Sequence, residues 1–281
     1  MLGLGAMGSR MALRLLRAGH HVSVFNRSTR PLQDLLAAGA VAGKTPRAAT
    51  DSADVVIAMV RDNEASRAVW CDDEDGALKG MGSGAIAIES STLTPGWIKH
   101  LATRVREAGA AFLDAPVIGS RPQAEAGQLI HLVGGNADTF DRAKGVLSVL
   151  GGAAHHVGPV GAGATLKLAV NALFGIQVAA LAELLGLLKN SGGDLTTMTE
   201  TLASLPVTSP AAKGALALMQ TKADAPLFPI DLVEKDFAYA LDQAPAHLPM
   251  TEAGYQCFAR AKAEDLAALN ITAIARLYQE R

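Results

Sequence analysis

Gly3-Leu4-Gly5-Ala6-Met7-Gly8 is a G-x-G-x-x-G run directly before an amphipathic helical pattern over residues 8–18. In this setting Gly3 permits a tight turn, Gly5 lets a pyrophosphate approach the backbone, and Gly8 lets the helix pack closely. The helix N-terminus offers N–H groups and a positive dipole end to phosphates. An ordinary glycine turn is the alternative, but the strand–helix–strand context favours a dinucleotide site. Its predicted residues are Gly3, Leu4, Gly5, Ala6, Met7 and Gly8.

Short apolar runs alternate with helical patterns after this loop. We predict strands over residues 21–25, 54–60, 85–88, 111–113 and 129–133, and helices over 8–18, 30–38, 95–108 and 137–150. This alternation indicates a parallel sheet covered by helices on both faces. Beyond the turn-rich stretch 158–163 the pattern is helical almost to the end. The sequence thus predicts an α/β fold, with a Rossmann-type doubly wound parallel sheet (residues 1–160) followed by an all-α domain (residues 161–281).

Composition and charge exclude several classes of protein. The 281 residues are 49% hydrophobic and 19% charged, and the net charge of −2 argues against a nucleic-acid partner. Cys71 and Cys257 lie far apart with no metal-ligand spacing, and His155-His156 has no third ligand, so we predict no metal site. We expect a soluble protein in a reducing, cytoplasmic compartment.

The apolar stretch 168–188 is long enough to cross a membrane. It carries Asn171, Gln177 and Glu183 and is rich in alanine. Helices that are apolar on all sides are often core helices. We therefore interpret it as a buried helix between two domains and expect no membrane partner.

The end of the predicted strand over residues 21–25 and the turn after it bear on cofactor choice. Their sequence is Phe25-Asn26-Arg27-Ser28. NAD-specific sites usually carry Asp or Glu here, which takes the ribose hydroxyls. Arg27, with Ser28 and Arg30, can instead pair with the 2′-phosphate of NADP through charge-assisted hydrogen bonds. A solvated loop arginine is the alternative. We predict a site that includes Asn26, Arg27 and Ser28, with NADP preferred and NAD possible.

Five motifs in order give the chain a family resemblance. They are GLGAMG (3–8), SSTLTP (90–95), DAPVIGSRPQAEAGQL (114–129), GAGATLKLAVN (161–171) and FPIDLVEKD (228–236). The chain resembles the β-hydroxyacid dehydrogenases, a group that includes 3-hydroxyisobutyrate dehydrogenase, tartronate semialdehyde reductase and the glyoxylate/succinic semialdehyde reductases. The resemblance implies an NAD(P)-dependent oxidoreductase with a small-molecule substrate, and a homodimer or homotetramer built on the helical domain.

The resemblance gives Lys167 the role of catalytic acid and base. It would donate a proton to the carbonyl oxygen as hydride arrives, and burial in a domain cleft would tune it for that task. Asn171 follows four residues later, so both side chains share one helix face, where the amide can hold the substrate or orient the lysine. A lysine in an apolar run needs an explanation in any case. Snorkelling from a helix end is the alternative.

The resemblance also assigns cofactor contacts. Thr92 corresponds to the family residue near the nicotinamide ribose. The alternative is a cap of the helix before Pro95, and both can be true. Met59 and Val60 occupy the loop after the third strand. Lys235 resembles a lysine that reaches the cofactor from the helical domain, although it could equally be a surface charge paired with Asp231 or Asp236.

The predicted substrate contacts lie at Gly119 and Ser120. There the family holds the substrate carboxylate with backbone N–H groups and a hydroxyl, although a simple turn after a strand is the alternative. Many members have serine at the position of Ile118, which cannot donate a hydrogen bond. We expect weak affinity for small, very polar acids such as glyoxylate.

The opening strand is shorter than in the family, since only Met1 and Leu2 precede the glycines. We expect the natural chain to begin several residues earlier.

Three functions remain open. The leading hypothesis is an NADPH-dependent reductase of small aldehydes or keto acids. An imine reductase shares the architecture, but such enzymes usually carry Asp or Tyr in place of Lys167. A non-catalytic dinucleotide-binding protein is the third, and the presence of both Lys167 and Asn171 argues against it.

Overall fold

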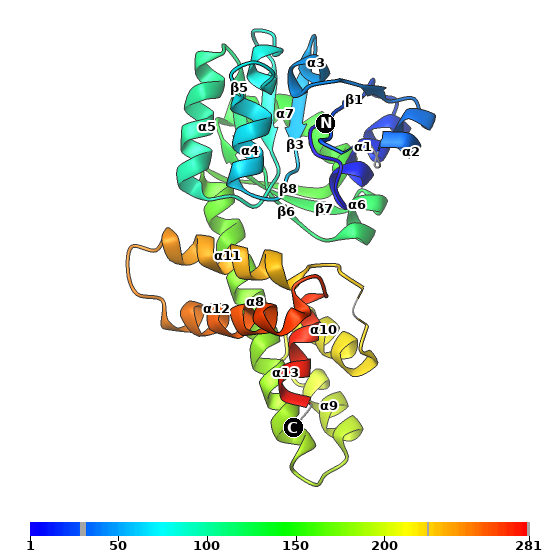
Figure 1. Ribbon diagram of the computed structural model, residues 1–281, viewed down its shortest axis with the longest axis vertical. Helices are drawn as coiled ribbons and strands as arrows, with labels where there is room; N and C mark the ends of the chain where they lie inside the picture. Colours follow the sequence, from blue (N-terminus) through cyan, green and yellow to red (C-terminus); the bar gives the residue numbers. More distant parts are fainter. Residues whose placement is uncertain (29–31, 224, 280–281) are drawn as a thin grey trace. The chain divides into compact units, whose positions relative to one another are not determined.

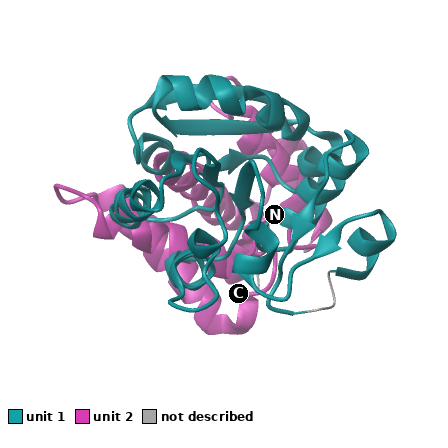
Figure 2. Ribbon diagram, turned by 90° about the horizontal axis from the view of Figure 1, so that it is seen from above, with its two compact units in different colours: residues 1–167 teal, residues 168–281 magenta. Residues whose placement is uncertain are grey.

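The computed structural model describes residues 1–28, 32–223 and 225–279. Arg30, one of the predicted phosphate contacts, lies outside these residues. The chain divides into two compact units, Met1–Lys167 and Leu168–Arg281 (Figure 2). The first is the α/β unit and the second is helical (Figure 1), which confirms the predicted fold class.

The first unit alternates strands with helices (Figure 1). Its strands are β1 Ser23–Val24, β2 Val41–Ala42, β3 Val55–Ala58, β4 Ile86–Glu89, β5 Ala111–Asp114, β6 Val117–Ile118, β7 Leu129–Gly135 and β8 Gly151–Gly158. Its helices are α1 Gly8–Arg17, α2 Leu32–Ala37, α3 Pro46–Thr50, α4 Asn63–Cys71, η1 Ala77–Lys79, α5 Pro95–Glu107, α6 Arg121–Ala126 and α7 Ala137–Leu150.

The opening segment lies between β1 and β3. Leu2 forms parallel bridges with both Phe25 and Ala58. The Leu2 N–H donates to the Ile57 carbonyl, and the Met59 N–H donates to the Leu2 carbonyl, both at 2.8 Å. The segment therefore joins the β1–β2 pair to the larger sheet and delivers the glycine loop to the carboxyl end of β3.

The larger sheet is not wholly parallel, which corrects the sequence-based expectation. Strands β3, β4 and β5 are parallel, but β7 runs antiparallel to β5 and β6, while β8 is parallel to β7. Hydrophobic alternation carries no information on strand direction. The link between β6 and β7 contains only α6, six residues long, whereas a parallel neighbour needs a crossover of about a dozen residues or more.

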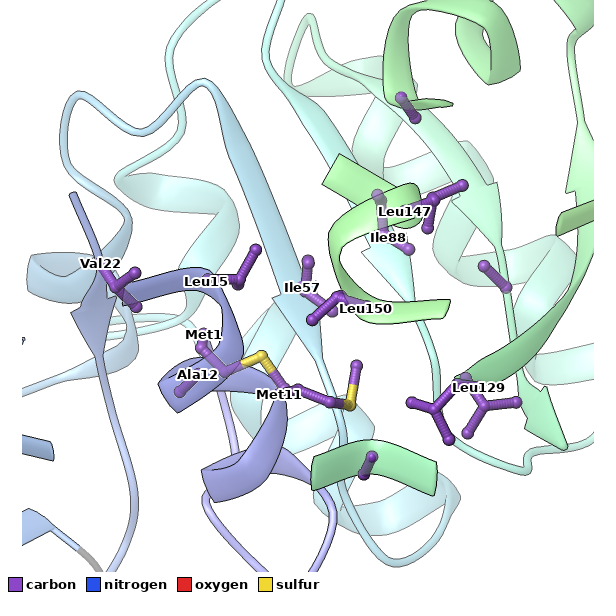
Figure 3. Packing of buried hydrophobic residues seen from close by; sticks show 14 of the residues in the cluster. Met1, Met11, Ala12, Leu15, Val22, Ile57, Ile88, Leu129, Leu147 and Leu150 are labelled. Atoms are coloured by element: carbon purple, nitrogen blue, oxygen red, sulfur yellow. The ribbon is translucent and has the colours of Figure 1, made fainter. Parts of the chain in front are cut away.

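Both faces of the sheet are covered. Along β3, Ile57 packs in a cluster with residues of α1 and α7, while Val56 and Ala58 pack with residues of α4 and α5. This is the alternation of a strand buried on both sides. Figure 3 shows the first cluster, in which Met11 and Leu15 of α1 approach Ile57 and the α7 residues.

The second unit consists of helices. They are α8 Ala162–Lys189, α9 Leu195–Ser204, α10 Pro210–Thr221, α11 Ile230–Asp242, α12 Pro249–Ala261, η2 Lys262–Leu266, η3 Ile271–Ala275 and α13 Arg276–Gln279, with the first turns of α8 belonging to the first unit. Phe237 and Phe258 stack at the core with ring centroids 5.6 Å apart. By length and composition α8 is apolar enough to cross a membrane, and half of its most apolar window is buried within the fold.

Candidate active site

The three glycines of the loop differ in their surroundings. Gly3 has φ +84°, and a Cβ there would collide with the Met59 carbonyl oxygen. A Cβ on Gly8, the first residue of α1, would collide with the Gly3 carbonyl oxygen. A Cβ on Gly5 would meet nothing within 4 Å. The outer glycines thus close the turn, and the open backbone at Gly5 beside a helix N-terminus suits a pyrophosphate.

Asn26 ties the segment that follows β1 to this loop. Its Oδ1 accepts a hydrogen bond of 2.8 Å from the Leu4 N–H, and its Nδ2 donates to the Ser28 carbonyl (2.8 Å) and hydroxyl (3.0 Å). The turn that carries Arg27 is therefore held beside the glycines, with the Arg27 side chain exposed. An exposed guanidinium on a held turn, with no carboxylate at the strand end, fits a dinucleotide that bears an extra phosphate.

The loops that follow β3 and β4 are linked to each other. The Val60 N–H donates to Ser91 Oγ (2.7 Å), and the Asn63 side chain exchanges hydrogen bonds with Thr94, at 2.9 Å to Oγ1 and 3.1 Å from its N–H. Thr94, rather than Thr92, caps α5 through Oγ1. Because Thr94 takes the cap position, Thr92 does not cap this helix. Thr92 is half-buried in the same loop.

Glu89 holds the loop that follows β4. The sequence analysis did not predict this residue. Its carboxylate is fully buried and accepts hydrogen bonds from the Ser91 N–H (3.0 Å), Ser66 Oγ (2.7 Å) and Trp70 Nε1 (2.9 Å). Burial raises the pKa of this carboxyl, and the hydrogen bonds partly oppose that shift. The available signal was an acidic residue that ends the apolar run Ile86–Glu89.

The predicted substrate loop is a constrained turn. Gly119 has φ +118°, and a Cβ there would lie 2.9 Å from Gln123 Cβ. Ser120 is the N-cap of α6 and forms a capping box with Gln123, in which the Ser120 N–H donates to Oε1 at 2.9 Å. Ile118 is half-buried in β6, opposite Ile130 of β7. Because the Ser120 N–H is engaged with Gln123, Gly119 stays the predicted backbone donor of this loop.

Lys167 lies on α8, in the second turn from Ala162, and is half-buried. Asn171 lies one turn further on the same face, in the second unit, where it is buried. Its Nδ2 donates to Asp236 Oδ2 at 2.6 Å. Asp236 lies on α11. The sequence analysis named it only as an alternative ion-pair partner of Lys235, not as a site residue.

Asp236 also binds Lys235. The Lys235 ammonium lies 2.7 Å from Asp236 Oδ1 and 4.4 Å from the centre of the Tyr239 ring. The alternative interpretation named this pairing with Asp236, but the side chain of Lys235 is only 15% exposed, so the pair is not on the surface. The second unit therefore brings Asn171 and Lys235 together around one buried carboxylate.

His156, one of the two adjacent histidines, has local partners. His156 Nε2 lies 2.8 Å from the Gly135 carbonyl oxygen, and its ring stacks on Phe140. Within the described ranges no group of three or more His, Cys, Asp or Glu side chains could hold a metal ion.

Comparisons with known proteins place this geometry in a family. Residues 1–158 match the family described as the NAD binding domain of 6-phosphogluconate dehydrogenase. Residues 161–278 match the family described as NAD-binding of NADP-dependent 3-hydroxyisobutyrate dehydrogenase.

Individual relatives agree. The chain is 32% identical over 278 residues to glyoxylate/succinic semialdehyde reductase 2 of Arabidopsis thaliana, covering 97% of this chain and 77% of that one. It superposes on Mycobacterium tuberculosis 3-hydroxyisobutyrate dehydrogenase, solved with L-serine, with a TM-score of 0.90 at 27% identity, covering 99% and 97% of the two chains. An imine reductase from Pseudomonas sp. shares the fold, with a TM-score of 0.63 at 23% identity and coverage of 98% and 96%.

Fold and site define an NAD(P)-dependent oxidoreductase that acts on CH–OH groups. The chain belongs to the β-hydroxyacid dehydrogenase family, as its sequence motifs predicted.

Proposed function

We propose that the protein is an NADPH-dependent reductase of small aldehydes or keto acids, with Lys167 as the proton donor. The observation that carries this proposal is the placement of Lys167 and Asn171 one helical turn apart on α8, with the Asn171 amide fixed by Asp236. A half-buried lysine beside an oriented amide is suited to proton transfer to a carbonyl oxygen.

The residues of the first unit would hold the cofactor. The Gly3–Gly8 loop and the start of α1 would receive the pyrophosphate, Arg27 and Ser28 the 2′-phosphate, and Thr92 and Val60 the nicotinamide half. The bound cofactor supplies the hydride. The relatives' names support a carbonyl substrate, since one acts on glyoxylate and succinic semialdehyde.

Lys167 Nζ donates a proton to the substrate oxygen as the carbonyl carbon is reduced, and accepts it back in the reverse direction. Because Asn171 Nδ2 binds Asp236, Oδ1 is on the other side of the amide, where it can accept from an ammonium or a substrate hydroxyl. Gly119 offers a backbone N–H to the substrate carboxylate.

The test is NADPH oxidation by the purified protein with semialdehydes, keto acids and cyclic imines. We expect turnover with semialdehydes of short chain length. Turnover of imines alone would replace this function by imine reduction, and an absence of turnover with every compound, while NADPH binds, would favour a non-catalytic dinucleotide-binding protein.

We propose further that the protein is a homodimer or homotetramer. Leu173 and Leu187 on α8 are 61% and 66% exposed, and large exposed apolar residues on one helix are typical of an interface. Light scattering after gel filtration tests this, and a monomer at micromolar concentration would contradict it.

A further inference from the structure

Asp114 ends β5 with its side chain fully buried. Its Oδ1 accepts a hydrogen bond of 2.8 Å from the Gly161 N–H, and its Oδ2 accepts one of 2.8 Å from the Ala164 N–H. These donors flank the first residue of α8, Ala162. One carboxylate thus binds two backbone groups of the turn from which α8 starts.

The surroundings leave this carboxylate little room. A Cβ on Gly163 would lie 2.9 Å from Asp114 Oδ2 and would collide with the Leu132 carbonyl oxygen. A Cβ on Gly134 would lie 2.9 Å from the carboxyl carbon, Cγ. The backbones of β7 and α8 therefore approach the carboxyl group from two sides, and it cannot shift without moving the start of the helix.

A neutral side chain can also cap a helix in this fold. Asn136 caps α7 by accepting a hydrogen bond from the Thr139 N–H (3.1 Å). Burial raises the pKa of the Asp114 carboxyl, so keeping an anion there costs free energy that a neutral cap avoids. What the carboxylate adds is a second acceptor, which fixes the helix at two points instead of one.

The helix fixed in this way carries Lys167. Lys167 follows Ala164 by three residues, about 5 Å further along the helix axis. Both residues and Asp114 belong to the same compact unit. We infer that Asp114 is a positioning residue for Lys167: its two-point hold on Gly161 and Ala164 sets the place of the lysine ammonium for proton transfer. This inference rests on the proposed role of Lys167.

The first test is Asp114→Asn. The amide keeps the size of the side chain but offers one acceptor oxygen, so either Gly161 or Ala164 faces an N–H group. A displacement of about 1 Å at a reacting group can cost on the order of 10²-fold in rate. We expect kcat to fall by roughly ten- to a hundredfold while the Kd for NADPH stays nearly unchanged, because the glycine loop and Arg27 are untouched.

Two control variants separate positioning from loss of stability. Asp194→Asn makes the same change at the exposed cap of α9, where Oδ1 accepts from the Thr197 N–H, and should leave kcat unchanged. Thr50→Val removes two hydrogen bonds of a buried hydroxyl, to the carbonyls of Arg47 and Ala77. It should lower the melting temperature without lowering kcat.

The decisive comparison introduces Asp114→Asn into a Lys167→Ala background. If Asp114 acts through Lys167, the double variant has nearly the same kcat as Lys167→Ala alone. Equal factors in both backgrounds, or a normal kcat for Asp114→Asn alone, would overturn the inference while leaving the role of Lys167 intact. A normal kcat for Lys167→Ala alone would overturn the proposed function and the inference with it.

Discussion

Glu89 and Asp114 are register partners at the carboxyl ends of the parallel strands β4 and β5. Both side chains are fully buried, and each accepts backbone hydrogen bonds from the segment it holds. Glu89 holds the loop that contains Thr92, and Asp114 holds the start of the helix that carries Lys167. Two adjacent buried carboxylates thus fix two neighbouring parts of the candidate active site.

Replacing Glu89 by Gln should loosen the Ser90–Thr94 loop. Glutamine cannot accept from all three present donors, so one of Ser91, Ser66 or Trp70 loses its partner, at a cost of about 1–3 kcal/mol in stability. We expect a lower melting temperature and a higher Kd for NADPH, measured by fluorescence titration. An unchanged Kd would show that this loop does not contribute to cofactor binding.

Replacing Arg27 by Asp should reverse the cofactor preference. The loss of a charge-assisted pair costs on the order of 1.5–3 kcal/mol, roughly ten- to a hundredfold in NADPH affinity, while NADH binding is spared or improved. The measurement is kcat/KM with each cofactor, with Arg106→Asp at the end of α5 as a control at an exposed arginine. Equal use of both cofactors by the unmodified protein would refute the preference.

The fold could be predicted from local patterns. The G-x-G-x-x-G run indicates a nucleotide-binding turn, and strands and helices differ in the spacing of their apolar residues. The direction of β7 could not be predicted, since hydrophobic alternation is the same in parallel and antiparallel strands. Strands β2 and β6 have two residues each, which is too short to show apolar alternation. The sequence analysis therefore did not predict them.

The site was predictable only where residues belong to motifs. Asn171 and Lys235 were predicted in this way, but Asp236, which joins them, lies 65 residues from Asn171 in sequence, and its contact depends on how α8 and α11 pack. Glu89 and Asp114 look like ordinary strand ends in the sequence. The backbone groups they bind become apparent only when the chain is folded.

Replacing Ile118 by Ser should improve the use of small, polar acids. Ile118 offers no hydrogen bond, and a donor to a charged group is worth about 1.5–3 kcal/mol. For the unmodified protein we expect kcat/KM to rise with aldehyde chain length, since each methylene in an apolar pocket contributes about 1–3 kcal/mol. Ile118→Val is the apolar control. The hypothesis fails if glyoxylate is the best substrate of the unmodified protein or if the serine variant gains nothing.

His131 makes the stability of the fold depend on pH. This fully buried side chain on β7 has its pKa lowered by burial from 6.5 to about 4. The unfolded chain therefore binds a proton below about pH 6.5 that the folded chain refuses, so stability is complete above that pH and is lost as pH falls toward 4, by about 3 kcal/mol at most.

The measurement is the free energy of unfolding between pH 7 and pH 4.5 for the unmodified protein and for His131→Gln. Glu89 and Asp114 act in the opposite direction, because their raised pKa values favour the folded state as pH falls. They are common to both proteins and cancel in the difference. Parallel pH curves for the two proteins would contradict the role of His131.

The most direct test of the whole account is the kcat of Lys167→Ala for NADPH-dependent reduction of the best aldehyde substrate, measured beside the Kd for NADPH. Lys213→Ala, an exposed lysine on α10, is the matched control. We predict that kcat falls by about 10²- to 10⁴-fold, as for loss of a general acid, while NADPH binding is nearly unchanged and the control behaves as the unmodified protein. Near-normal turnover by Lys167→Ala would contradict the account.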